Sequence, residues 1–121
     1  MIQEMYCSYE VSKLLKEKGF DWECISYYVD DEPHDIKYSF LGETNSTWES
    51  RCCSAPTHQM AMKWLREIHN VFIIIEPYSD TSCYFSLWQG DIYRENPLKK
   101  GFPSYEETVE AALKYVLKNL I

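Results

Sequence analysis

Apolar side chains recur at helical intervals near both ends of the chain. In residues 9–18 they follow Ser8, whose side chain can accept a hydrogen bond from the first turn of a helix. In residues 105–119 they follow Ser104, and Glu107 completes a capping box with that serine. Both segments are therefore predicted to be amphipathic helices that bury one face.

A third helix and a strand are predicted one after the other in the middle of the chain. Residues 57–69 carry one apolar stripe with charged side chains outside it, which is typical of an amphipathic helix. Residues 71–75 are five apolar residues in a row, four of them aliphatic and β-branched. Such a run is typical of a strand that is covered on both faces, so we expect it in the middle of a sheet.

Two hairpins are predicted from aromatic or alternating segments that are separated by turn residues. An acidic turn that contains Pro33 separates the first pair, and the loop at residues 78–81 separates the strand at 71–75 from the next strand. Gly90-Asp91 is predicted to be a tight turn into a further short strand. Residues 43–55 are polar and are predicted to be an irregular connection. With the run at 71–75, the expected strand segments are residues 21–29, 36–41, 71–75, 83–88 and 92–93.

These elements predict a single α+β domain over residues 1–121. The expected order is α-β-β-α-β-β-(β)-α, with about three helices and an antiparallel or mixed sheet of about four to five strands. At this length folding buries about two thirds of the surface of the unfolded chain. A core can therefore form without metal ions or disulfide bonds.

The net charge of −7 comes from the first part of the chain. Residues 1–50 hold 4 basic and 11 acidic side chains, whereas residues 51–100 hold 6 and 5. An acidic surface repels phosphate backbones, so nucleic acid is not an expected partner. The charge suits a basic protein partner, or an acidic mimic that occupies a nucleic-acid-binding enzyme of a host. The alternative is that it serves only solubility.

The cysteines and the N-terminal residues indicate a reducing compartment. The chain has five cysteines, an odd number that does not suit a framework of disulfide bonds. The first residues show no basic segment followed by an apolar stretch, and no run of about 18 apolar residues could cross a bilayer. We therefore expect a cytoplasmic protein with no membrane partner.

One cluster of thiols and imidazoles could carry chemistry. Cys53 precedes the predicted middle helix, and His58 or His69 could act as a base toward it. The spacing offers no zinc site, because adjacent Cys52 and Cys53 point apart and no CxxC motif exists. The acidic turn over residues 30–35 lacks the ligand spacing of a calcium loop. No catalytic residue, metal ligand or cofactor is predicted.

Aromatic residues offer a second candidate for function. The chain holds 10 Tyr, 5 Phe and 4 Trp, and many of them lie in the predicted strands. If Tyr27 or Tyr28 shares an uncovered face of the sheet with Tyr84 and Trp88, that face is an aromatic platform of the kind enriched in protein interfaces. The alternative is that these side chains form a thick aromatic core.

Three segments carry a resemblance to a known group of proteins. They are CSAPTHQ at residues 53–59, WLREIHN at residues 64–70 and PSYEETVEAAL at residues 103–113. In these segments the chain resembles small proteins encoded by phages, prophages and related mobile elements of Bacteroides-type gut bacteria. The resemblance implies an origin on a mobile element and a cytoplasmic host setting, and it assigns no activity and no catalytic residue.

The leading hypothesis is a non-enzymatic accessory protein of the phage or prophage type that acts through protein–protein contact. The aromatic platform is its expected contact surface, and a homodimer through that surface is one form of the contact. The acidic mimic is the second hypothesis. A small enzyme that uses Cys53 with a histidine is the third.

Overall fold

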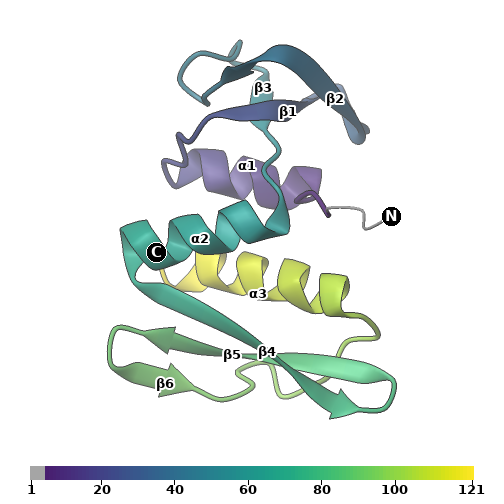
Figure 1. Ribbon diagram of the computed structural model, residues 1–121, viewed down its shortest axis with the longest axis vertical. Coiled ribbons are helices and arrows are strands. Elements are labelled where there is room, and N and C mark those ends of the chain that lie inside the picture. Colours follow the sequence, from purple (N-terminus) through teal and green to yellow (C-terminus); the bar gives the residue numbers. More distant parts are fainter. Residues whose placement is uncertain (1–4) are drawn as a thin grey trace. The chain divides into compact units, whose positions relative to one another are not determined.

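The chain folds as an α+β protein in the computed structural model, which describes residues 5–121 (Figure 1). Within this range it has three helices and six strands. By their internal contacts the residues divide into two compact units, Met1–Gln59 and Met60–Ile121. Each unit contains a three-stranded antiparallel sheet.

The N-terminal unit begins with helix α1 (Tyr9–Glu17), as predicted. The side-chain oxygen of Ser8 accepts a hydrogen bond from the backbone N–H of Val11 at 3.2 Å. Gly19 follows the helix with a φ angle of 91°, a conformation that glycine adopts at little cost. Capping residues at both ends therefore set the length of this helix.

The N-terminal sheet has the strand order β2-β1-β3. The central strand β1 (Cys24–Val29) pairs with β2 (Glu32–Glu43) to form the predicted first hairpin. On its other side β1 pairs with β3 (Cys52–Ser54), which lies inside the predicted irregular connection. That part of the prediction is wrong, because three residues are too few to show the two-residue period of a strand.

The core of this unit lies between the sheet and α1. Tyr28, Cys53 and Ala55 are buried together, with Tyr9 and Ile36 packed against them. The Tyr28 hydroxyl donates a hydrogen bond to the backbone carbonyl of Cys7 at 2.8 Å, which satisfies a polar group inside the core.

The C-terminal unit contains the second sheet, of order β4-β5-β6. Helix α2 (His58–His69) leads into β4 (Val71–Ser79), which is followed by β5 (Ser82–Gln89), β6 (Ile92–Arg94) and helix α3 (Tyr105–Asn119). The predicted strands and helices of this region are confirmed, and Ser104 caps α3 as expected. The Ser104 oxygen accepts a hydrogen bond from the Glu107 N–H at 3.1 Å and donates one to the Glu107 carboxylate, also at 3.1 Å.

Helix α3 covers one face of the second sheet (Figure 1). Phe85 and Leu87 point to this face and are almost completely buried. The ring of Phe85 lies 5.9 Å from the ring of Tyr115 on α3. Because side chains alternate along a strand, Tyr84, Ser86 and Trp88 point to the opposite face.

Strand β4 does not occupy the position that its sequence suggested. The apolar run over residues 71–75 was expected in the middle of a sheet, but among the described residues β4 is an edge strand that pairs only with β5. Phe72 in this run is 44% exposed. The composition of the run indicates a strand correctly, yet it does not reveal how many neighbours the strand has.

The strand count and the sheet arrangement also differ from the prediction. One sheet of four to five strands was expected, whereas the described residues form six strands in two separate sheets. The additional strand is β3. Hydrophobic periodicity reports the conformation of a segment and not the identity of its partner, so it does not separate two sheets from one.

Candidate functional site

The four aromatic residues predicted to form one platform lie on two different sheets. Tyr84 and Trp88 are four residues apart on β5 and therefore share one face of the C-terminal sheet. Tyr27 and Tyr28 are neighbours on β1 of the N-terminal sheet, so they point to opposite faces. Tyr28 is a buried core residue. A single face that includes all of these residues is therefore not formed by either sheet.

Three aromatic side chains form a row across the uncovered face of the C-terminal sheet. Phe72 on β4 is paired with Trp88 on β5, and Trp88 is paired with Tyr93 on β6. Their exposed fractions are 44%, 41% and 44%, respectively. The rings of Trp88 and Tyr93 lie 4.9 Å apart at an angle of 37°. We call these three residues the aromatic row.

Of this row, only Trp88 is among the residues predicted from the sequence. Tyr93 could have been found from the turn at Gly90-Asp91, because a tight turn there places residue 93 opposite residue 88. Phe72 requires the register between β4 and β5, which depends on the turn near residues 79–82 and includes an irregularity between Pro77 and Ser79. A shift of one residue would have placed Phe72 on the other face.

The same face becomes polar toward the other end of β5. Ile74 is paired with the buried Ser86, and Glu76 is paired with Tyr84. The Ser86 hydroxyl accepts a hydrogen bond from the backbone N–H of Asn96 at 3.2 Å. This bond ties the loop that follows β6 to the sheet.

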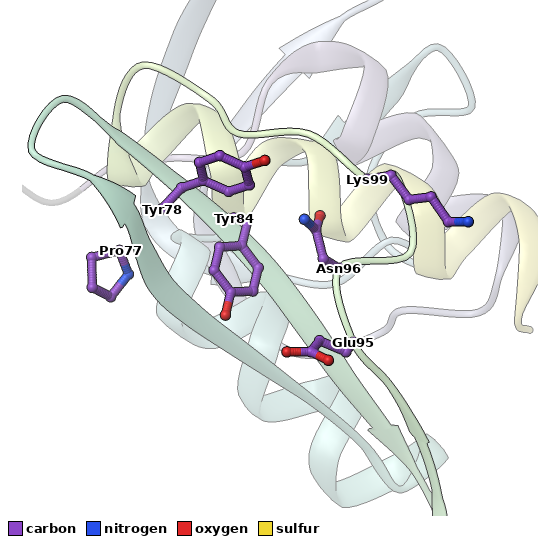
Figure 2. A pocket seen from close by; sticks show the side chains of 6 residues that line it. All are labelled: Pro77, Tyr78, Tyr84, Glu95, Asn96 and Lys99. Carbon is purple, nitrogen blue, oxygen red and sulfur yellow. The ribbon is translucent and has the colours of Figure 1, made fainter.

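A pocket of about 580 Å³ lies at this polar end. Figure 2 shows the carboxylate of Glu95 facing the hydroxyl of Tyr84, while the ammonium group of Lys99 points away from both. The rings of Tyr78 and Tyr84 meet edge to face at 5.7 Å. The residues that line the pocket are Pro77, Tyr78, Tyr84, Glu95, Asn96 and Lys99.

The surroundings of Tyr84 in this pocket raise its pKa. A hydrogen bond from its hydroxyl to the Glu76 carboxylate is the main cause that raises this pKa above 10.0, and partial burial and the charge of Glu95 add to the effect. Tyr84 therefore keeps its proton at neutral pH and acts as a hydrogen-bond donor. The pocket presents carboxylate acceptors and aromatic rings, which suits binding.

The thiol of Cys53 is protonated, whereas a reactive cysteine nucleophile is a thiolate. Burial raises its pKa to about 11, well above 9.0, although Lys13 and Lys16 lower it in part. At neutral pH almost none of the thiol is ionised, and only the thiolate attacks a substrate. Of the two candidate bases, His58 is buried, and the ring of His69 lies 4.8 Å from the ring of Trp64.

The acidic hairpin between β1 and β2 forms exposed ion pairs with cations of the same unit. Asp30 accepts hydrogen bonds from the Lys13 ammonium at 3.1 Å and the Tyr9 hydroxyl at 3.0 Å, and these contacts lower the pKa of its carboxyl. The remaining acidic residues of this turn are also in ion pairs. Lys37 contacts Glu32 and Asp35, and Arg51 lies 3.8 Å from Asp31.

Tyr27 lies in a second, smaller hollow on the N-terminal sheet. Its ring lies 4.5 Å from the ring of Trp48, which donates a hydrogen bond to the Ser54 hydroxyl at 2.7 Å. The hollow has a volume of about 370 Å³, and Arg51 and Glu49 also line it. Trp48 from the connecting segment therefore shields the face to which Tyr27 points.

Neither a metal site nor a membrane helix is found in residues 5–121. No group of three or more His, Cys, Asp or Glu side chains in this range is arranged to hold a metal ion. The helices of the same range lack the combination of length and apolar composition that is needed to cross a bilayer.

Comparison of the chain with protein-family models, with curated protein sequences and with solved structures finds no match.

Proposed function

We propose that the protein is a non-enzymatic accessory protein of the phage or prophage type, and that it binds a protein partner through the uncovered face of the β4-β5-β6 sheet. The observation that carries the proposal is the aromatic row. Phe72, Trp88 and Tyr93 stand side by side on three paired strands, and each is more than two-fifths exposed.

The row has the properties of an interface centre. Aromatic side chains are enriched in interfaces and supply large contact areas with few rotatable bonds. A fully buried aromatic side chain removes roughly 150–250 Å² from water, so covering the exposed parts of Phe72, Trp88 and Tyr93 removes on the order of 80 Å² for each. At about 25 cal/mol per Å² this is about 2 kcal/mol for each side chain before the costs of association.

The polar end of the same face adds a chemical preference to the binding. Glu76 and Glu95 place carboxylates beside Tyr84, and Figure 2 shows Glu95 directed toward that hydroxyl. A partner segment that covers both ends would present apolar side chains to the aromatic row and a donor or a cation to the pocket.

The two alternative functions receive less support from the described residues. An enzyme based on Cys53 would need a thiolate, whereas burial raises the pKa of this thiol to about 11. An acidic mimic would need carboxylates free to meet a basic partner, whereas Asp30, Asp31 and Glu32 are engaged with cations of their own unit.

Photo-crosslinking tests the proposal directly. A photoreactive phenylalanine analogue is placed at position 88 or 93 and, as a control, at position 105, where Tyr105 is 45% exposed at the start of α3. In lysate of a Bacteroides-type bacterium, we expect the same protein to be linked from positions 88 and 93 and not from position 105. Equal labelling from all three positions, or none from 88 and 93, would contradict the proposal.

A further inference from the structure

The free edge of β4 is a second surface of the C-terminal unit with its own chemistry. In the order β4-β5-β6 this strand of nine residues pairs with β5 alone, and no other strand within residues 5–121 pairs with its outer edge. An edge strand presents backbone N–H and C=O groups that can hydrogen-bond to a strand of another chain.

Strand β2 is also an edge strand, but it has protective features that the run Val71–Ile75 of β4 lacks. Proteins protect edge strands with charges, prolines and bulges. Strand β2 has Pro33 and Lys37, and its register with β1 shifts twice. The run Val71–Ile75 of β4 has no charge and no proline, and its register with β5 is unbroken. Over this run the edge is therefore apolar and carries none of these protective features, which lie beyond it at Glu76, at Pro77 and at the register shift between Pro77 and Ser79.

The side chains of β4 restrict which strand can be added to it. Phe72 and Ile74 point to the uncovered face, whereas Val71, Ile73 and Ile75 point to the face that α3 covers. A strand added at this edge must therefore be apolar on both of its faces over about five residues, because cross-strand neighbours contact one another directly. The run Val71–Ile75 meets this requirement itself.

We propose that two copies of the protein associate by antiparallel pairing of their β4 strands about Ile73, so that two three-stranded sheets become one sheet of six strands. In this register Val71 lies opposite Ile75 of the second copy, and Phe72 lies opposite Ile74. Glu76 lies opposite Asn70 rather than opposite another Glu76. Every residue of the apolar run thus meets an apolar residue.

The charge of the C-terminal unit also permits this pairing. Residues 60–121 carry 7 Lys and Arg against 8 Asp and Glu, so the paired units themselves repel one another only weakly, and most of the −7 of each chain lies in the other unit. The pairing is argued from the edge of β4 and does not depend on the partner proposed for the aromatic row. It would place two aromatic rows on one continuous face.

The mass of the unaltered protein in solution is the first measurement. Light scattering over a dilution series from about 1 mM to about 1 μM should give twice the 14.4 kDa of one chain at high concentration and fall toward one chain on dilution. Ile74→Lys should shift this transition to at least about tenfold higher concentration, because it places two ammonium groups near one another across the new strand pair. The mass of one chain at every concentration would overturn the proposal.

Mixed variants and matched controls identify the interface. Ile74→Glu should weaken association as Ile74→Lys does, and an equal mixture of the two variants should restore the dimer because the charges are then opposite. Ile68→Lys changes an isoleucine of α2 that is 57% exposed, and Trp88→Ala changes the aromatic row. Both should leave the dimer intact. A dimer that survives Ile74→Lys, or that Ile68→Lys disrupts equally, would contradict β4 pairing.

Hydrogen exchange of the unaltered chain keeps the proposal testable if the Ile74 variants fail to fold. Amides of Val71–Ile75 that point to the free edge should exchange more slowly as the concentration rises, whereas those of β2 should not change. Exchange in β4 that is independent of concentration would overturn the proposal.

Discussion

The two sheets of this protein have the same number of strands and the same antiparallel pairing, yet their uncovered faces differ. In the N-terminal sheet, Trp48 lies over Tyr27, and the acidic hairpin is held in ion pairs with Lys13, Lys37 and Arg51. In the C-terminal sheet, the aromatic row is exposed and no charged residue interrupts it. The N-terminal sheet also exposes apolar side chains, among them Phe40 and Leu41 of β2, whereas the C-terminal sheet places three exposed aromatic side chains at paired positions of three neighbouring strands.

The largest expected effect is on the free energy of unfolding, which should differ between substitutions on the two faces of β5. Phe85→Ala should lower the free energy of unfolding by about 3–5 kcal/mol, because this ring is almost completely buried under α3. Trp88→Ala, three residues along the same strand, should lower it by less than about 1.5 kcal/mol, because its ring is already partly in water. Chemical denaturation measures both. Equal losses would show that Trp88 is part of the core.

The second prediction concerns the N-terminal unit. With a pKa of about 11 in place of 9.0, the fraction of Cys53 present as thiolate near pH 7 falls by about 100-fold. Alkylation of the native protein, followed residue by residue by mass spectrometry, should therefore modify Cys53 at least about 100 times more slowly than free cysteine. The partly exposed Cys83 serves as an internal comparison. Rapid labelling of Cys53 would restore the hypothesis of a thiol enzyme.

Features that depend on neighbouring residues could be predicted from the sequence, whereas features that depend on distant segments could not. Helix ends depend on neighbouring residues, so Ser8, Gly19 and the Ser104–Glu107 capping box could be predicted correctly. The short strand β3 and the edge position of β4 depend on pairing between distant segments, which local patterns do not report.

The candidate site shows the same division. The sequence named Trp88 and Tyr84, which do share a face, because they are four residues apart on one predicted strand. It did not name Phe72 and Tyr93, since their places opposite Trp88 come from the registers of two different strand pairs. It also grouped Tyr27 and Tyr28 with them, because composition does not distinguish one sheet from another.

The N-terminal caps of α1 and α3 allow a smaller comparison of the two units, because each helix is capped by a serine. Ser104→Ala removes an oxygen that accepts a hydrogen bond from the Glu107 N–H, and Ser8→Ala removes the equivalent contact with Val11. Each change should cost about 1 kcal/mol of stability, as helix caps commonly do. Denaturation curves of both variants provide the measurement. No loss from either variant would contradict the assigned capping roles.

The smallest expected effect is the contribution of Asp30 to the dependence of stability on pH. Hydrogen bonds from Lys13 and Tyr9 hold the pKa of its carboxyl below 3.8 in the folded protein. Its contribution to stability is therefore present above the ordinary pKa and is lost as the pH falls through the lowered value. Asp30→Asn should reduce the difference in stability between neutral and acidic pH, as measured by urea denaturation. An unchanged difference would show that the ion pair contributes nothing.

The most direct test of the central claim is the affinity of the purified partner found by crosslinking for two variants of this protein. Trp88→Ala should weaken binding by about 30-fold, since a central aromatic residue of an interface commonly contributes about 2 kcal/mol. Tyr105→Ala, which removes a ring of similar exposure outside the sheet, should change it by less than about threefold. Equal affinities for the unaltered protein and the Trp88→Ala variant would contradict the claim that the aromatic row is the contact surface.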